Sequence, residues 1–547
     1  MIFSLKRPSV PPNYNISYLE HRILPSSSVR FLGVFLDPKL SGKNHMSFII
    51  NKGKKILQII SALRGTWWGA HPHMLISIYR SMLRASIEYS AHIFGLINND
   101  KSRALQVLQN QALRLCFGYR ISTPLNVIYA ETVELSLPFR FRLLTSRYFM
   151  KISSVRDHPA VLKLHELCDL AMRKNRMDYL RAHFPAALTF RHIWTFHQDI
   201  DCSFTLPNFR HSFHSTITSS SYTSLSVPSL ESLKLFPNLC AQALFDHEFS
   251  HLTAESTVFY TDGSKVDHGT YVGAAVFSPQ LRAELMYRLS SYTSVFSAEA
   301  YAIYNAVTLS IDLHLRKVSI VTDSKSVLDS ISGSINRTNN YLIPLIKAGL
   351  EEAEANGTRI QFIWVPSHKG ITGNEKADQL AKRAIRQGIE PNFKVPYSDM
   401  SAVIKQRISD NFYRHLESMA ETKGAYFFTH IFRKSSKPWY FHKKISREII
   451  VILNRLRSDH YNLNFSLYRK NLFEEPSCPC GSPRQDIIHL IYDCPYTYVQ
   501  ARYLRRMVDR TSNAGDNANK FSQAISDPSE CVCRLILNLC KACNRHF

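Results

Sequence analysis

The sequence lacks a long apolar run, because no stretch of its 547 residues reaches the roughly 18 consecutive apolar residues that span a bilayer. It also lacks a recognisable secretory signal, since the short apolar run in "MIFSLKRPSVPPNYN" is broken by Lys6, Arg7 and Pro8. We therefore expect an intracellular protein, in the nucleus or the cytoplasm, with no membrane partner. In a reducing compartment, the 11 cysteines are expected to be thiols or metal ligands rather than disulfides.

Acidic residues are scarce relative to basic ones. The chain has 67 Lys and Arg against 43 Asp and Glu, a formal net charge of +24. Such a surplus favours a polyanionic partner, because cations that neutralise phosphates release condensed counterions. Nucleic acid is the expected partner, with an anionic membrane surface or a merely basic surface as alternatives. The apolar share of 45% is ordinary for a globular protein. The length predicts three or four structural units, and the sequence shows no internal repeat.

The first half of the chain has mainly helical periodicity. Short strands are predicted within residues 1–40. Helices are predicted from Lys43 to about Gly65, after Pro72, from Lys101 to Cys116 and across 139–185. The stretch "STITSSSYTSLSVP", residues 215–228, has no sustained helical period and is predicted to be a linker.

After this linker the pattern changes to alternating strands and helices. Strands are predicted at 257–261, 270–278, 282–289, 317–323 and 359–365, and helices at 295–312, 325–331, 340–355 and 375–387. Three consecutive strands followed by strands separated by helices predict an α/β domain, with a mixed five-stranded sheet flanked by helices.

Three acids occupy positions that belong to buried faces. Asp262 follows the apolar run "VFYT" and precedes a predicted Gly-Ser turn, and Asp323 closes "KVSIVTD". Glu299 shares its helical face with Ala302 and Ile303, the stripe expected to pack on the sheet. Taken singly, each acid could be a turn, cap or helix-surface residue.

A fourth acid, Asp378, follows near the start of a helix opened by "TGNEKAD", for which Asn374 is a predicted N-cap. Alone it would be a first-turn acid favoured by the helix dipole. Clustered carboxylates repel one another and lose hydration, so protons or cations must offset their charge. Mg²⁺ prefers oxygen ligands, and two such ions can stabilise the attacking and leaving oxygens of a phosphoryl displacement.

The segments "YTDGS", "SAEAYAIYNAV", "IVTDSKSVLDSI" and "WVPSHKGITGNEKADQLAK" together resemble the type 1 ribonuclease H domain, in the version found in reverse-transcriptase polyproteins of jockey-like non-LTR retrotransposons. The resemblance implies hydrolysis of the RNA strand of RNA–DNA hybrids with two Mg²⁺ ions, held by Asp262, Glu299, Asp323 and Asp378. His368, in "PSHKGITGN", resembles the mobile histidine that assists proton movement and product release. A nucleic-acid-binding remnant without activity, or another nuclease or integrase with a related core, are the alternatives.

The flanks carry weaker similarity to the same polyproteins. "VRFLGVFLDPKLSGKNHMSFII" and the helices after it resemble the end of the polymerase palm and the thumb, although a plain helical scaffold would show the same pattern. The palm needs paired aspartates, and no Asp-Asp dipeptide occurs, so we expect the chain to begin after the polymerase active site and to lack polymerase activity. The expected regions are a palm-end remnant (1–40), a thumb-like helical region (41–150), a connection with a Ser-rich linker (151–255), the ribonuclease H domain (256–390), a helical connector (391–475), a Cys/His segment (476–500) and a helical tail (501–547).

The Cys/His segment "CPCGSPRQDIIHLIYDC" offers Cys478, Cys480, His489 and Cys494. Three thiolates and one imidazole suit tetrahedral Zn²⁺, with reduced buried thiols as the alternative. The spacing, preceded by "LNRLRSDHYNLN", resembles the segment that follows the nuclease in these retrotransposon proteins. The four cysteines of "CVCRLILNLCKAC" are predicted to belong to an apolar helix.

Overall fold

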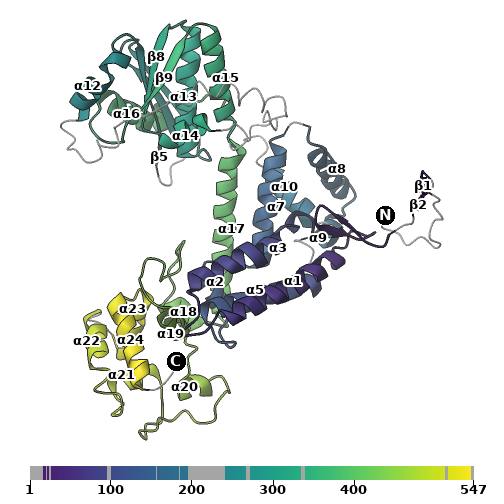
Figure 1. The fold of residues 1–547 in the computed structure, drawn as a ribbon, viewed down its shortest axis with the longest axis vertical. Helices are drawn as coiled ribbons and strands as arrows, with labels where there is room; N and C mark the ends of the chain where they lie inside the picture. Colours follow the sequence, from purple (N-terminus) through teal and green to yellow (C-terminus); the bar gives the residue numbers. More distant parts are fainter. Residues whose placement is uncertain are drawn as a thin grey trace. The chain divides into compact units, whose positions relative to one another are not determined.

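The computed structural model describes residues 16–19, 21–23, 26–94, 100–155, 157–183, 185–194, 241–266, 271–333, 339–511 and 515–543 (Figure 1). The predicted linker at 215–228 lies outside these residues. The chain divides into two compact units. The sheet unit comprises 146–182 and 187–406, and the helical unit comprises 1–145, 183–186 and 407–547.

The sheet unit is built on five strands in the order β7-β6-β5-β8-β9. The strands are β5 (Thr257–Lys265), β6 (Tyr271–Ser278), β7 (Ala283–Ser290), β8 (Lys317–Thr322) and β9 (Arg359–Trp364). β5, β6 and β7 form an antiparallel meander, whereas β8 and β9 run parallel to β5. The helices that accompany them are α8 (Pro159–Arg173), α9 (Met177–His183), α10 (Pro185–Trp194), α12 (Ala241–Thr253), α13 (Val295–Asp312), α14 (Lys325–Ser332), α15 (Leu342–Ala355) and α16 (Thr372–Gln387).

Helices α13 and α16 pack on opposite faces of the sheet, and two glycines permit the close approach. A Cβ on Gly263 would lie 2.6 Å from the Glu299 backbone nitrogen of α13, and one on Gly273 would lie 1.9 Å from the Ala381 carbonyl oxygen of α16. Ser264 pairs with Gly273, so Gly263 and Gly273 point to opposite faces of the pleated sheet. Any larger residue at either position would push a helix away from the sheet.

The predicted mixed sheet with flanking helices is confirmed, and the order of its strands and helices matches the sequence pattern. One local prediction is wrong. Gly263 and Ser264 do not form a turn, because β5 continues through both of them to Lys265 and both keep partners on β6. Asp262 therefore lies within a strand and not at its end, and the pairing of Thr261, Asp262 and Gly263 with β6 fixes its direction.

The helical unit combines both ends of the chain. Its first part contains β1 (Ile16–Tyr18), β2 (His21–Ile23), β3 (Val29–Phe31), β4 (Val34–Leu36), α1 (Lys43–Ala62), α2 (Pro72–Ile78), the π-helix η1 (Tyr79–Arg84), α3 (Ala85–Glu88), α4 (Ala91–Phe94), α5 (Asp100–Phe117) and α6 (Leu125–Thr132). Its second part contains α18 (Ala425–His430), α19 (Arg447–Arg457), α20 (Asn464–Tyr468), α21 (Ile487–Tyr492), α22 (Arg502–Thr511), α23 (Asn517–Ser526) and α24 (Glu530–Ala542). Helices α7 (Leu137–Ser153) and α17 (Tyr397–Ala420) contain residues of both units, as do α9 and α10 at their ends within 183–186.

One apolar core joins these two parts. It includes Ile60 and Leu113 from the first part and Ile450, Ile491 and Cys540 from the second. Cys531, Cys533 and Cys540 lie on α24 as the sequence predicts, whereas Cys543 follows the last residue of the helix. Cys540 is buried in this core. Among the described residues, no helix has both the length and the apolar character needed to cross a membrane.

Candidate active site

Two aspartates lie side by side because β5 and β8 are parallel neighbours. Thr261 pairs with Thr322 across the two strands, and each is followed directly by an aspartate, Asp262 and Asp323. Side chains alternate along a strand, so residues at matching register positions point to the same face. Asp262 is only 6% exposed, whereas Asp323 is half-buried.

Glu299 comes from the first turns of α13. This helix begins after Ser294, whose hydroxyl accepts a hydrogen bond from the Ser297 backbone N–H at 3.1 Å. The face beneath Glu299 carries Ala302 and Ile303, both fully buried as predicted. Because Gly263 has no side chain, the start of α13 approaches β5 closely enough to place Glu299 beside the two aspartates.

The three acids form a compact group, called here the carboxylate trio (Asp262, Glu299 and Asp323). One oxygen from each lies within 4.8 Å of the others, which is a suitable arrangement for a metal ion. The Ser324 hydroxyl donates a hydrogen bond to Glu299, and the Asn374 amide donates one to Asp323 at 3.4 Å. Within the described part of the chain, no member of the trio forms a salt bridge with a basic residue.

Burial and mutual repulsion make the trio hold protons tightly. Burial, followed by the charges of Asp323, Asp378 and Glu299, raises the pKa of Asp262 to about 7. Burial and the Asp323 charge raise the pKa of Glu299 to about 7, against the lowering effect of the Ser324 hydroxyl. Burial also raises the pKa of Asp323. A divalent cation would offset this repulsion and replace the protons.

These pKa values predict a pH dependence of stability in the absence of divalent cations. Folded-state pKa values near 7 exceed the ordinary values of 3.8 for Asp262 and 4.5 for Glu299. Their contribution to stability is therefore fully present below pH about 4 and is lost as the pH rises through about 7, by up to about 1.4 kcal/mol per pH unit for each proton. Urea-unfolding midpoints at pH 5 and pH 7.5 measure this loss. Asp262→Asn should reduce it, and an identical loss in parent and variant would contradict the assignment.

Asp378 and His368 belong to a second cluster beside the trio. One ligand atom each from His368, Glu375 and Asp378 lies within 4.8 Å of the others. Asp378 is therefore not a member of the carboxylate trio by this distance, although its charge contributes to the raised pKa of Asp262. Lys382, one turn further along α16, contacts the Asp378 carboxylate at 2.6 Å. His368 is exposed and has a left-handed backbone with φ 55°.

The structure corrects one prediction here and adds one residue that the sequence pattern did not reveal. Asn374 is not the N-cap of α16, because the helix begins at Thr372 after Ile371. Asn374 is instead a buried residue of the first turn that bonds Asp323. The missed residue Glu375 accepts a hydrogen bond from the Gly370 backbone N–H at 3.1 Å and so braces the loop that carries His368. Its position three residues before Asp378, on the same helix face, was the available signal.

The predicted zinc ligands also come together, in the helical unit. One atom each from Cys478, Cys480, His489 and Cys494 lies within 4.8 Å of the others. Cys480 Sγ is 3.2 Å from His489 Nε2, and Cys478 Sγ is 3.9 Å from Cys494 Sγ. All three cysteines are free thiols. This cluster of soft ligands suits a tetrahedral ion.

The local backbone explains how these distant residues meet. The Cys478 N–H donates to the Ser482 carbonyl at 2.8 Å, and the Gly481 N–H donates to the Cys478 carbonyl at 2.9 Å. This tight turn places Gly481 at φ 94°, a backbone conformation that favours glycine. At the other end, Asp486 caps α21 by accepting from the His489 backbone N–H at 2.9 Å. The turn and the cap together bring the Cys478 and Cys480 thiols close to the His489 imidazole.

Comparison with known protein families identifies a domain within the sheet unit. Residues 254–386 match the family model of RNase H. The match spans β5 to α16 and therefore includes the carboxylate trio and the His368 cluster. The chain thus contains an RNase H domain, which supports ribonuclease activity on RNA–DNA hybrids and dependence on divalent metal at the level of the family.

Proposed function

We propose that this chain cleaves the RNA strand of RNA–DNA hybrids by a two-metal mechanism within its RNase H domain. The observation that carries the proposal is the carboxylate trio. Three acids converge within 4.8 Å, inside the matched domain, without a basic partner among the described residues. Such a group of buried carboxylates destabilises the folded protein unless cations bind it, so its presence in a folded domain points to a metal-dependent role.

Mg²⁺ is the proposed ion, and the residues present fit it. The donor set is all oxygen, as hard divalent cations prefer. Asp262, Glu299 and Asp323 would hold one ion. Asp378 beside them is the proposed fourth acid, which would give up its salt bridge with Lys382 and bind the second ion instead. When bound, the two ions would supply charge stabilisation to the attacking and leaving oxygens of the phosphoryl displacement.

The protein's own residues would position the substrate and move protons. His368 is exposed on a loop, and one of its ring nitrogens lies within 4.8 Å of carboxylate oxygens of Glu375 and Asp378, where an imidazole can give or accept a proton. We propose that it assists proton movement and product release. Recognition of RNA would rest on its 2′-hydroxyl groups and on the shape of the hybrid rather than on base identity.

The test is cleavage by the purified full chain of an RNA–DNA hybrid labelled on its RNA strand. With Mg²⁺ we expect cleavage of the hybrid and none of matched RNA or DNA duplexes. A folded chain that binds the hybrid and leaves it intact would instead favour the inactive binding remnant. Equal cleavage of the DNA duplex would favour another nuclease or an integrase with a related core.

We further propose that Cys478, Cys480, His489 and Cys494 hold a structural Zn²⁺. Cys480→Ser should remove stoichiometric zinc, because a hydroxyl is a far weaker zinc ligand than a thiolate. Elemental analysis of the purified variants measures this directly. Cys531→Ser is the matched control, since Cys531 is exposed on α24 outside the cluster, and it should keep its zinc. A folded parent protein that contains no zinc would contradict the proposal.

A retrotransposon origin is proposed on the sequence segments that resemble jockey-like polyproteins before, within and after the RNase H domain. The match to RNase H supports the central part of that resemblance. In such a context, the helical unit and the Cys/His cluster would contact nucleic acid while the sheet unit removes RNA from hybrids.

A further inference from the structure

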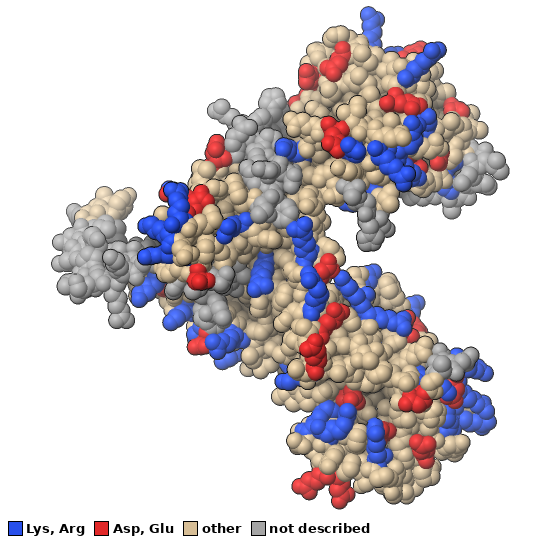
Figure 2. Space-filling view, turned by 180° about the vertical axis from the view of Figure 1, so that it is seen from behind, with Lys and Arg blue, Asp and Glu red and all other residues tan. Residues whose placement is uncertain are grey.

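On the face of the molecule drawn in Figure 2, the basic side chains are not gathered into one patch. Lys and Arg side chains are spread over both units, with acidic side chains between them. Surface charge alone therefore does not mark a contact site on that face. Inside the helical unit, however, basic residues converge on a cavity of about 340 Å³, called here the arginine cavity.

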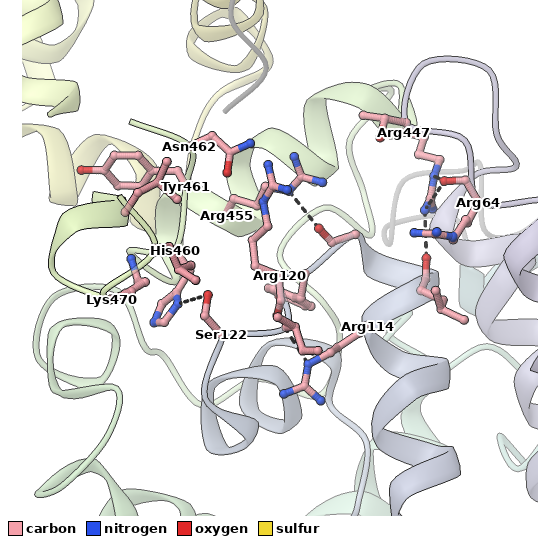
Figure 3. A pocket seen from close by; sticks show the side chains of 17 residues that line it. Arg64, Arg114, Arg120, Ser122, Arg447, Arg455, His460, Tyr461, Asn462 and Lys470 are labelled. Atoms are coloured by element: carbon pink, nitrogen blue, oxygen red, sulfur yellow. Dashed lines mark hydrogen bonds between the residues drawn. The ribbon is translucent and has the colours of Figure 1, made fainter. Parts of the chain in front are cut away.

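The arginine cavity lies between α5, the loop after it, α19 and the loop that follows α19 (Figure 3). Its wall contains six basic side chains: Arg64, Arg114, Arg120, Arg447, Arg455 and Lys470. No Asp or Glu of the described chain is among its lining residues. Asp459, which is not a lining residue, attracts the Lys470 ammonium group electrostatically. Its carboxylate, however, forms a salt bridge with Arg469 at 2.6 Å.

Backbone carbonyl groups accept hydrogen bonds from several of these cations. Arg455 donates to the Gly118 carbonyl at 2.9 Å, Arg114 to the Thr123 carbonyl at 3.0 Å and Lys470 to the Asp459 carbonyl at 2.9 Å. Arg447 has a structural role, since it is 5% exposed and bonds the carbonyls of five residues. Carbonyl groups orient these side chains without cancelling their charge.

Arg120 differs from its neighbours in one respect. Its Nε is buried and has no hydrogen-bond partner in the described structure. Arg64, Arg114, Arg120, Arg447 and Lys470 form no salt bridge with a carboxylate of the described residues. A half-buried guanidinium whose buried Nε donor is unused, close to other cations, is an arrangement that an anionic ligand would complete.

The charges in the cavity repel one another. Burial, Arg120 and Arg447 lower the pKa of Arg455 to about 9, and burial is the main cause that lowers the pKa of Lys470 to about 8. Because like charges in a half-buried site are unfavourable, folding alone does not explain why the site holds so many of them. A bound anion would remove the repulsion.

We propose that the arginine cavity binds a phosphate group of a nucleic-acid strand, with Arg114, Arg120 and Arg455 as its main ligands. The planar guanidinium fork matches phosphate oxygens in a way that a point charge does not. The volume is of the order that accommodates a small ligand, and the apolar wall, including Ile121 and Leu472, can cover a sugar. That the phosphate belongs to nucleic acid rests on the proposed function.

The proposal gives a role to a motif that the nuclease leaves unexplained. "LNRLRSDHYNLN" contributes Arg455, His460, Tyr461 and Asn462 to the cavity wall. His460 Nδ1 is 3.0 Å from the Ser122 hydroxyl, which ties the loop after α19 to the loop after α5. The motif therefore both builds the cavity and supplies one of its cations.

The experiment measures binding of a fluorescein-labelled single-stranded DNA 12-mer to the full chain carrying Asp262→Asn. Arg120→Gln should weaken binding about tenfold and Arg120→Lys should recover only part of it. Arg506→Gln, which removes an exposed arginine of α22, is the matched control and should change binding less than about twofold. The melting temperature of the ligand-free Arg120→Gln protein should stay level or rise, because a like charge is removed.

Competitors identify the source of the phosphate. We expect the DNA to bind more tightly than inorganic phosphate or a nucleoside monophosphate, and Arg120→Gln to reduce the binding of all three. Tighter binding of the free monophosphate than of the DNA would overturn the strand assignment. Equal, Arg120-dependent binding of a polyglutamate peptide would point to an acidic protein partner and overturn the proposal.

DNA binding that does not depend on Arg120 would also overturn the phosphate site. So would a lower melting temperature of the ligand-free Arg120→Gln protein, because it would indicate a structural role for Arg120. Arg455→Gln provides a second variant from another element. Failure of the parent chain to cleave hybrids, with Arg120-dependent binding intact, would count against the proposed nuclease and not against the arginine cavity.

Discussion

Asp262→Asn should reduce cleavage of RNA–DNA hybrids by about a thousandfold or more, the effect of losing about 4 kcal/mol of transition-state stabilisation. The amide has nearly the shape of the carboxyl group but no charge, so the carboxylate trio would lose the charge that attracts a divalent cation. Asp262 is the most buried acid of the carboxylate trio, since it is 6% exposed, and both other acids lie beside it.

Three controls make the result specific. Asp329→Asn changes an exposed aspartate of α14 in the same domain and should leave the cleavage rate unchanged. Hybrid binding by Asp262→Asn should persist, and its metal-free form should be at least as stable as the parent above pH 7. Full activity in Asp262→Asn would show that the trio is not the catalytic centre.

Arg457→Met should destabilise the helical unit by about 3 to 5 kcal/mol, the usual result of leaving a buried ion pair without one partner. Arg457 Nη2 contacts Glu131 at 2.7 Å, and the two side chains are only 5% and 3% exposed. The same guanidinium also donates to the carbonyls of Ile525 and Ser526. One side chain therefore connects α6, α19 and the end of α23.

Urea unfolding of the full chain measures this effect. Arg469→Met is the matched control, because Arg469 pairs with Asp459 nearer the surface and its loss should cost below about 1 kcal/mol. Adding Glu131→Leu to Arg457→Met should restore part of the stability, since the uncompensated buried charge disappears. Equal destabilisation by Arg457→Met and Arg469→Met would show that the buried pair has no special weight.

The sheet unit could be predicted well from its sequence because local patterns determine it. Alternation of apolar residues, short connections and helical stripes fix β5 to α16, and parallel pairing then brings Asp262 and Asp323 together. The mistaken turn at Gly263 has a physical reason. Glycine is common in turns, but here it serves the approach of α13, a tertiary contact that local propensity does not encode.

The helical unit was far less predictable. Each amphipathic helix reveals which of its faces is buried but not the helix that covers it. Nothing in the periodicity of α5 indicates that Leu113 shares a core with Ile450 of α19. The arginine cavity was missed for the same reason, since its cations come from separate segments and become neighbours only after this packing.

The shared core of the helical unit has a consequence for the order of events during synthesis. Its two parts are separated by most of the sheet unit, and Glu131 must wait for Arg457, 326 residues later, before the pair can form. Domains generally fold as units while the chain emerges, so the sheet unit can fold first. The early helices meanwhile expose apolar faces, which makes the nascent chain a candidate for chaperone protection until residues 407–547 are made.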